Sequence, residues 1–278
     1  MNIHSVSSTQ KESLSFIDPD FCPTVVRRRI TDDLIYLLAG IGEVLVTRGR
    51  SLTWNRSYPS RSSYDSAFYR LKKAGLIAHR LQGGKVVLEL TEKGRKRVPD
   101  ECKPMKFWNR EWDGIWHLLV YDIPEKNRCY RETLRRFLHR MRMGCLQRSV
   151  YVSHKDIRPE YDDLVQAARV ERYSYLFAAK TVLGRPALEI VHTAWKVDRL
   201  EIAQSWYLDV CSHYKNRLSR EEFTNEQLTT LAREEMSAYM SVMEQDPLLP
   251  RELWPTGYLG EKVYKAHCDM AEEIGKRL

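Results

Sequence analysis

The stretch SRSSYDSAFYRLKKAGLIAHRLQGGKVVLELTEKGRKR, residues 60–97, decides the fold of the first part of the chain. Serines are typical of a helix start, and Gly75 suits the left-handed residue that follows a helix. Four apolar residues recur at helical spacing, which predicts one buried stripe: Tyr64, Ala67, Phe68 and Leu71. The pattern therefore predicts a helix over residues 60–75.

Two runs rich in β-forming residues follow, residues 76–81 and 86–90, with Gly83-Gly84 between them. A Gly-Gly turn between such runs predicts a hairpin, and residues 91–97 close the unit. Taken singly, such a helix and hairpin also occur in plain cores and sheets. In this order they indicate a winged helix-turn-helix, whose helix enters the major groove of DNA while the hairpin reaches the backbone.

Positive charge is concentrated in the same part of the chain. The 278 residues carry 45 Lys and Arg against 37 Asp and Glu, a net charge of +8. Residues 21–110 alone hold 19 Lys and Arg against 8 Asp and Glu, so the net charge of this third exceeds the net charge of the whole chain. Such a concentration is what neutralisation of DNA phosphates requires, although a solvated surface can also carry it.

The outer faces of the predicted helix and hairpin supply candidate DNA contacts. Short side chains let a helix backbone approach a groove, and arginine reaches guanine or phosphate. We therefore expect five residues to serve the groove: Arg61, Ser63, Ser66, Tyr69 and Arg70. Three residues are expected to hold phosphates: Lys73, Arg80 and Lys85.

The middle of the chain alternates strand and helix signals. A turn, a strand and a sharp stop are predicted within residues 112–124, further strands at 145–152 and 174–183, and helices at 127–142 and 159–171. This order fits part of a ferredoxin-like domain of the βαββαβ type. From Thr193 onward the pattern is helical, with helices expected over residues 225–243 and 260–276.

These patterns together predict an α+β protein of three domains. The predicted domains are a winged-helix domain at 24–98, which includes a helix start at Thr31, a ferredoxin-like domain at 105–190 and a helical domain at 191–278.

Three separated groups of motifs resemble the PaaX-type repressors of phenylacetate catabolism. Their central domain is in turn similar to the small ferredoxin-fold subunit of CRISPR adaptation. The matching motifs are Trp112-Asp113-Gly114-x-Trp116, Tyr121-Asp122-Ile123-Pro124-Glu125, Arg131-x-x-Leu134-Arg135-Arg136-x-Leu138, Gln147-x-Ser149-Val150-Tyr151-Val152, Trp206-Tyr207-Leu208-x-x-Cys211-x-x-Tyr214 and Asp246-Pro247-Leu248-Leu249-Pro250-x-Glu252-Leu253-x-Pro255.

The resemblance implies a bacterial or archaeal homodimer that binds double-stranded DNA and represses promoters. It also implies release from DNA when an aryl-CoA thioester such as phenylacetyl-CoA binds as the effector. No other cofactor is implied. The effector assignment depends on the resemblance alone, because the sequence has no glycine-rich phosphate loop.

Two features of the central domain leave alternatives open. Asp122 could hold a metal ion across a dimer axis, as an aspartate does in the CRISPR-type relatives, or it could cap the following helix or pair with Arg128 or Arg131. The helical arginines could contact DNA or a CoA phosphate, or form a solvated face: Arg128, Arg131, Arg135, Arg136, Arg140 and Arg142.

Other features limit the functional classes. The six cysteines form no C-x-x-C pair, which argues against a disulfide framework and a zinc site. The apolar runs fall short of the roughly 20 residues of a membrane helix, and no secretory signal is visible, so we expect a cytoplasmic protein. The leading hypothesis is a non-enzymatic transcriptional regulator. A Mg-dependent nuclease or CRISPR-adaptation-like accessory acting through Asp122, and a scaffold that uses DNA incidentally, are the alternatives.

Overall fold

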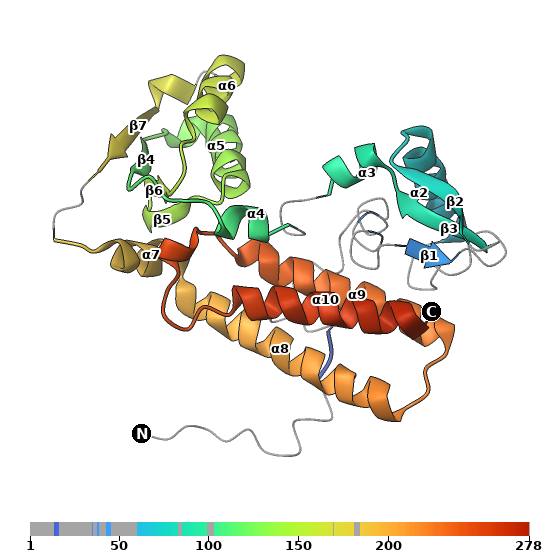
Figure 1. Cartoon of the computed structure of the whole chain (residues 1–278). Helices are drawn as coiled ribbons and strands as arrows, with labels where there is room; N and C mark the ends of the chain where they lie inside the picture. Colours follow the sequence, from blue (N-terminus) through green and yellow to red (C-terminus); the bar gives the residue numbers. More distant parts are fainter. Residues whose placement is uncertain are drawn as a thin grey trace, which may run out of the picture. The chain divides into compact units, whose positions relative to one another are not determined.

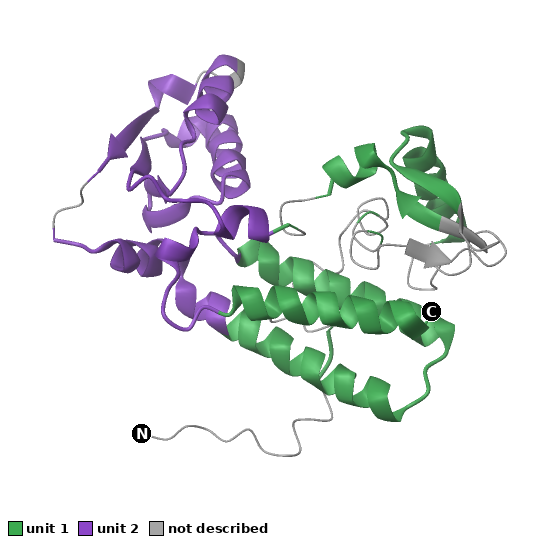
Figure 2. Ribbon diagram, in the orientation of Figure 1, with its two compact units in different colours: residues 1–103, 202–245, 259–278 green, residues 104–201, 246–258 purple. Residues whose placement is uncertain are grey.

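The computed structural model describes residues 14–16, 35, 38, 43–45, 60–82, 85–98, 103–168, 170–180 and 184–277. The chain divides into two compact units (Figure 2). One unit comprises residues 1–103, 202–245 and 259–278, and the other comprises residues 104–201 and 246–258. The fold is α+β, as predicted. The division into three domains at the predicted boundaries stays a prediction.

The N-terminal part contains a helix followed by an antiparallel hairpin. Helix α2 spans Arg61–Lys73, strands β2 and β3 span Ile77–Gln82 and Lys85–Leu90, and the short helix α3 spans Glu92–Lys96. Strand β1, Glu43–Leu45, pairs with the other edge of β3, which gives a three-stranded sheet in the order β1-β3-β2. The predicted helix and hairpin are therefore confirmed as elements.

Most of the upstream part lies outside the described residues, and this includes the helix start predicted at Thr31. Of that region, Ile35 and Leu38 are helical and buried. The interpretation of the N-terminal part as a winged helix stays a prediction.

The central part has a four-stranded antiparallel sheet with helices between its strands (Figure 1). After α4, Met105–Trp108, the elements are β4 Trp116–Tyr121, η5 Glu125–Asn127, α5 Arg128–Arg140, β5 Gly144–Gln147, β6 Val150–Ser153, α6 Arg158–Ala168, η6 Val170–Arg172 and β7 Ser174–Ala179. The sheet order is β5-β6-β4-β7. This is the βαββαβ order of a ferredoxin-like domain, with the first and third strands at the centre.

The prediction of one strand over residues 145–152 is wrong. The run forms the β5–β6 hairpin, in which Gly144 pairs with Val152 and Gln147 pairs with Val150 around a bulge. The polar pair Arg148-Ser149 forms the turn. This turn lacks the glycine, proline or asparagine that usually marks a tight turn in a sequence, so the apolar residues on both sides read as one strand.

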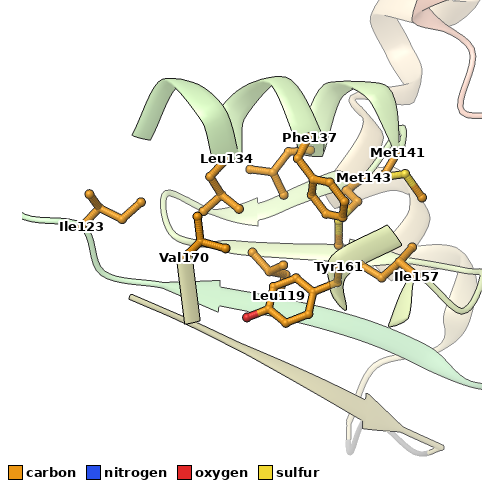
Figure 3. Close-up of a cluster of buried hydrophobic side chains, with 10 residues drawn as sticks. Leu119, Ile123, Leu134, Phe137, Met141, Met143, Ile157, Tyr161 and Val170 are labelled. Carbon is orange, nitrogen blue, oxygen red and sulfur yellow. The ribbon is translucent and has the colours of Figure 1, made fainter. Parts of the chain in front are cut away.

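The core of the central sheet lies beneath α5. Leu134 and Phe137 point from this helix toward the sheet, where they meet Leu119 of β4 (Figure 3). Tyr161 of α6 and Val170 complete the cluster, and all five side chains are buried. Helix α5 is therefore fixed by its inner face, which determines the direction of its outer face.

The C-terminal part is helical. Its elements are α7 Ala187–Trp195, α8 Val197–Arg220, α9 Asn225–Gln245, η7 Arg251–Leu253 and α10 Gly260–Arg277. The prediction placed the start of helical structure at Thr193, but α7 begins at Ala187 after Gly184 and Pro186. Pro186 precedes the first turn of this helix, a position that suits proline. Within the described ranges, no helix combines the length and apolar character needed to cross a bilayer.

The Asp246-Pro247-Leu248-Leu249-Pro250 motif has a packing role. Asp246 is buried; its Oδ1 accepts from the Leu248 N–H at 2.8 Å and its Oδ2 accepts from the Tyr258 hydroxyl at 2.6 Å. The Arg142 guanidinium donates to the carbonyl of Asp246. Arg142 itself has a φ of 53°, and its carbonyl accepts from the Trp195 Nε1–H at 2.9 Å. The buried carboxylate thus holds the segment 246–258 in shape, and the carbonyl of Asp246 joins it to Arg142 of the same unit.

Candidate nucleic-acid interface

Helix α2 has one buried face and one exposed face. Tyr64, Ala67, Phe68 and Leu71 are buried, as their spacing predicts. With about 3.6 residues per turn, the opposite side carries Ser62, Ser66, Tyr69 and Lys73. Tyr69 is 64% exposed, an unusual degree of exposure for a large aromatic residue. Arg61 and Arg70 are exposed on the flanks of this surface, and we call these six residues the reader face.

The first serines of α2 have different roles. The Ser60 hydroxyl accepts from the backbone N–H of Ser63 at 3.1 Å, which is an N-cap. The Ser63 hydroxyl lies 2.9 Å from that of Ser60, and Ser63 is half-buried. Ser62 is instead exposed on the reader face, although it is not among the candidates predicted from the sequence. Counting from the buried stripe would have identified it, because it lies four residues before Ser66.

The C-terminal end of α2 is held by α3. Lys93 Nζ donates to the carbonyl of Ala74 at 2.9 Å, and the Thr91 hydroxyl donates to the carbonyl of Gly75 at 2.6 Å. These bonds satisfy carbonyls that a helix end leaves without partners. A Cβ added to Gly94 would lie 2.0 Å from the carbonyl oxygen of Leu76, so only glycine allows this approach. The reader face therefore stands on a helix that is fixed at both ends.

The hairpin brings one predicted phosphate contact into an ion pair. In the register of β2 and β3, Gln82 faces Lys85 at the turn end. Arg80 lies 3.7 Å from Glu89, and its side chain is 60% exposed. This carboxylate partly offsets the charge that Arg80 could offer to a phosphate. Lys85 begins β3, and the placement of its side chain lies outside the described residues.

The six arginines from 128 to 142 separate into two sets. Arg131 donates to the carbonyl of Ile123 at 2.9 Å, and Arg142 donates to the carbonyl of Asp246. These two arginines therefore hold the fold. The other four are exposed on the outer face of α5: Arg128, Arg135, Arg136 and Arg140.

Asp122 is exposed at the end of β4, and its backbone N–H donates to the carbonyl of Tyr173 at 2.8 Å. The expected cap is absent, because the N-cap residue of α5 is Asn127 and its side chain makes no capping hydrogen bond. Arg131 bonds a backbone carbonyl rather than this carboxylate. Across the described ranges, no group of three or more His, Cys, Asp or Glu could hold a metal ion.

The helical part contains a buried polar cluster. Glu235 of α9 accepts from the Tyr207 hydroxyl, and its Oε1 lies 2.8 Å from His267 Nδ1, whose ring stacks on Tyr239 at 3.9 Å. Burial is the main cause that raises the pKa of Tyr207 and that of the nearby Cys211 thiol well above their ordinary values. Both groups stay protonated at neutral pH, so the thiol is a poor nucleophile. The cluster joins helices α8, α9 and α10.

Two findings relate the chain to known proteins. Residues 109–191 match the family described as PaaX protein central Cas2-like domain. The solved structure of an uncharacterized protein, Rv0674 from Mycobacterium tuberculosis, is similar over 88% of this chain and 94% of that chain, with a TM-score of 0.55 and 20% sequence identity. At that identity the likeness shows a shared fold alone. No curated protein matches this sequence.

Proposed function

This chain belongs to the PaaX-like family, and on that premise we propose that it is a sequence-specific DNA-binding transcriptional regulator. Family membership indicates transcriptional regulation, and a regulatory family is consistent with a non-enzymatic protein. Binding of duplex DNA, repression of a promoter and release by an effector are the parts that we propose beyond this.

The reader face is the observation that carries the proposal. Ser62 and Ser66 are short, so the helix backbone can approach base edges closely at that point. Arg61 and Arg70 flank them and can reach guanine or phosphate, while Tyr69 offers an exposed hydroxyl. The opposite side of α2 is buried, so the helix presents this surface in one fixed direction. Lys73, Arg80 and Lys85 are the proposed phosphate contacts.

The family resemblance further supports a homodimer whose effector is an aryl-CoA thioester. A dimer reads two half-sites separated by about 34–36 Å, one turn of the duplex. An effector that binds the DNA-free state more tightly shifts the population away from DNA. A thermal-shift panel of acyl-CoA thioesters tests this part, and a selective rise in the melting temperature with aryl thioesters is expected.

Two single substitutions test the division of roles between α2 and the hairpin. Arg70→Ala should cost about 1–3 kcal/mol of binding free energy and relax the preference at one base. Lys85→Ala should weaken binding to all duplexes and reduce the slope of log affinity against log salt by about 1. The measurement is a salt-titrated binding assay on duplexes selected from a random pool.

Lys96→Ala is the matched control for these variants. It also removes one positive charge from the N-terminal part, but Lys96 already lies 3.0 Å from Glu92 and is remote in sequence from the reader face. It should change neither base preference nor salt slope appreciably. Equal behaviour of Arg70→Ala and Lys85→Ala, or a selected pool without a shared sequence, would contradict the proposal.

A further inference from the structure

The outer face of α5 carries an excess of positive charge that its fold does not use. Leu134, Phe137 and Leu138 are buried on the inner face, and Figure 3 shows the first two pointing toward the sheet. The side facing away from the sheet exposes four arginines, which we call the arginine face: Arg128, Arg135, Arg136 and Arg140. His139 is exposed beside them.

One ion pair on the arginine face is formed with Glu132 of the same helix. Glu132 Oε1 lies 3.6 Å from Arg135, and both side chains are largely exposed. Arg136 bonds the carbonyl of Glu132 and the hydroxyl of Thr133, neither of which neutralises its charge. The Arg140 guanidinium lies 5.7 Å from the centre of the Phe137 ring. Most of the positive charge is therefore directed to the outside.

Helix stability explains part of this charge pattern, because Arg140 lies in the last turn and Glu132 precedes Arg136 by four residues. It does not explain the rest. The N-terminus of a helix favours negative side chains, yet α5 has no acid in its first turn and begins with Arg128. Arg136 and Arg140 are four residues apart, where like charges repel. The next helix, α6, follows the ordinary pattern and has Glu160 in its first turn. Four exposed arginines on one face suit a polyanionic partner outside the chain.

The chemistry of the arginine face favours duplex DNA among polyanions. Guanidinium groups bind phosphate through two parallel hydrogen bonds. From Arg128 to Arg140 the helix rises about 18 Å, and a duplex of that length presents several phosphates on each strand. Single strands are bound by aromatic stacking, but no large exposed aromatic lies on α5: within the described residues, the exposed aromatics are Tyr69, Tyr175 and Phe177.

We propose that the arginine face binds the phosphate backbone of double-stranded DNA. It is a second contact surface, on the central domain, which supplies affinity without reading sequence. The inference builds on the proposed DNA-binding function. It differs from that function in what it predicts, because the reader face determines base preference and the arginine face determines salt dependence.

The experiment removes the four charges from the full chain. The variant Arg128→Gln/Arg135→Gln/Arg136→Gln/Arg140→Gln is compared with wild type on a synthetic mixed-sequence duplex at several salt concentrations. The slope of log affinity against log salt should fall in magnitude by about 2–4, since each lost phosphate contact contributes about 0.9. The ratio of affinities for a selected and a scrambled duplex should stay unchanged.

A second variant controls for net charge. Four other exposed arginines are chosen from residues 104–201, and replacing them with glutamine removes the same charge: Arg158, Arg172, Arg185 and Arg199. The control should keep most of the wild-type slope. Thermal melting and circular dichroism of both variants verify that the fold is retained.

Three outcomes would overturn the inference: an unchanged slope in the arginine-face variant, an equal fall in the control, or unchanged DNA binding together with weakened binding of a CoA thioester. The last would assign the arginine face to the effector's phosphates. Failure of the proposed function is recognised separately. If wild type shows no base preference but the arginine-face variant still loses slope, the inference stands and sequence-specific regulation falls.

Discussion

Helices α2 and α5 have the same length, 13 residues, and each buries one apolar stripe, but their outer faces differ. The outer side of α2 mixes two serines and a tyrosine with flanking arginines, and Ser60 caps its start. The outer side of α5 is dominated by arginine, and its start has no side-chain cap. The basic residues of α2 lie mainly in its last turn, where the helix dipole favours them.

The difference between the two outer faces shows that the charge of a helix and the size of its exposed side chains are separate indications of a ligand. The charges at the end of α2 stabilise the helix in any case, so they say little about a ligand. The short side chains and the exposed tyrosine of α2 are the features that indicate one. Of the arginines of α5, Arg128 opposes the helix dipole, whereas Arg140 lies in the last turn, where the dipole favours it. What distinguishes α5 is the number of arginines that its outer face exposes. The comparison predicts that α2 determines which sequence is bound and α5 determines how strongly any duplex is bound.

The largest expected effects come from adding a methyl group to one tightly packed glycine in each unit. Gly94→Ala places a Cβ 2.0 Å from the Leu76 carbonyl oxygen, and backbone cannot move aside easily. We expect a loss of about 3 kcal/mol in the free energy of unfolding of the N-terminal part. Base preference should disappear as the end of α2 loosens. Denaturant unfolding combined with amide hydrogen exchange measures both.

Gly144→Ala is the matched variant in the central unit. Its Cβ would lie 2.5 Å from the Ala194 Cβ and 2.7 Å from the Trp195 ring. We expect a loss of about 2 kcal/mol there, with exchange protection of α2 retained. If either glycine variant loosened α2 and α5 equally, the two helices would belong to one cooperative unit and the comparison between them would fail.

A smaller effect is expected from acid, and it should start in the central unit. Burial, with Lys155 and Arg110 nearby, lowers the pKa of His154 from 6.5 to about 3. Below pH 6.5 the unfolded chain binds a proton at His154 that the folded chain does not bind. The free energy of unfolding therefore decreases as the pH is lowered, until about pH 3. Between pH 7 and pH 5 the loss should be about 2 kcal/mol.

Substitution of His154 by Gln tests this assignment. The variant should unfold with a flatter dependence on pH between 7 and 5, measured by denaturant titration at each pH. Asp156 does not affect stability between pH 7 and pH 5. Arg158 lowers the pKa of Asp156 to about 2, so the stabilisation that this carboxylate gives is lost only in stronger acid. An unaltered pH dependence in His154→Gln would assign the acid sensitivity to other groups.

The elements of α2 and its hairpin could be predicted from sequence because local signals determine them. Helical spacing fixes the buried side of α2, and a Gly-Gly pair marks the turn. The β5–β6 hairpin could not be predicted because Arg148-Ser149 lacks glycine, proline and asparagine, and serine alone is a weak turn former. The predicted start of helical structure, Thr193, lies inside α7, although Gly184 and Pro186 mark the true start of this helix.

Contacts that a sequence does not show decide which side chains of the candidate interface are available to a ligand and which hold the fold. Arg142 meets Asp246, 104 residues further along the chain, and Arg131 meets a backbone carbonyl. In the sequence both are simply members of an arginine-rich run. Ser63 likewise resembles its neighbours until the N-cap at Ser60 is located. Periodicity identifies which face of a helix is buried, but partners outside the helix decide which exposed residues are free for a ligand.

The smallest expected effects come from substituting the N-cap residue of each helix. Ser60→Ala removes the cap of α2 and should cost about 1 kcal/mol of unfolding free energy. Asn127→Asp gives α5 the acid that its first turn lacks and should gain about 0.5 kcal/mol. The Asn127 amide donates to the Tyr173 hydroxyl at 2.7 Å, and that hydroxyl can donate to an aspartate instead. Denaturant unfolding of the full chain measures both changes.

The second substitution also bears on DNA binding, because a carboxylate beside Arg128 repels phosphate. Asn127→Asp should therefore stabilise the protein while it lowers affinity for every duplex, with base preference unchanged. Asn127→Ala, which loses the Tyr173 bond without adding charge, should do neither. If Asn127→Asp brought no gain in stability, Arg128 would not be acting against the start of its helix. The inference that an outside partner accounts for the arginines of α5 would then lose part of its energetic basis.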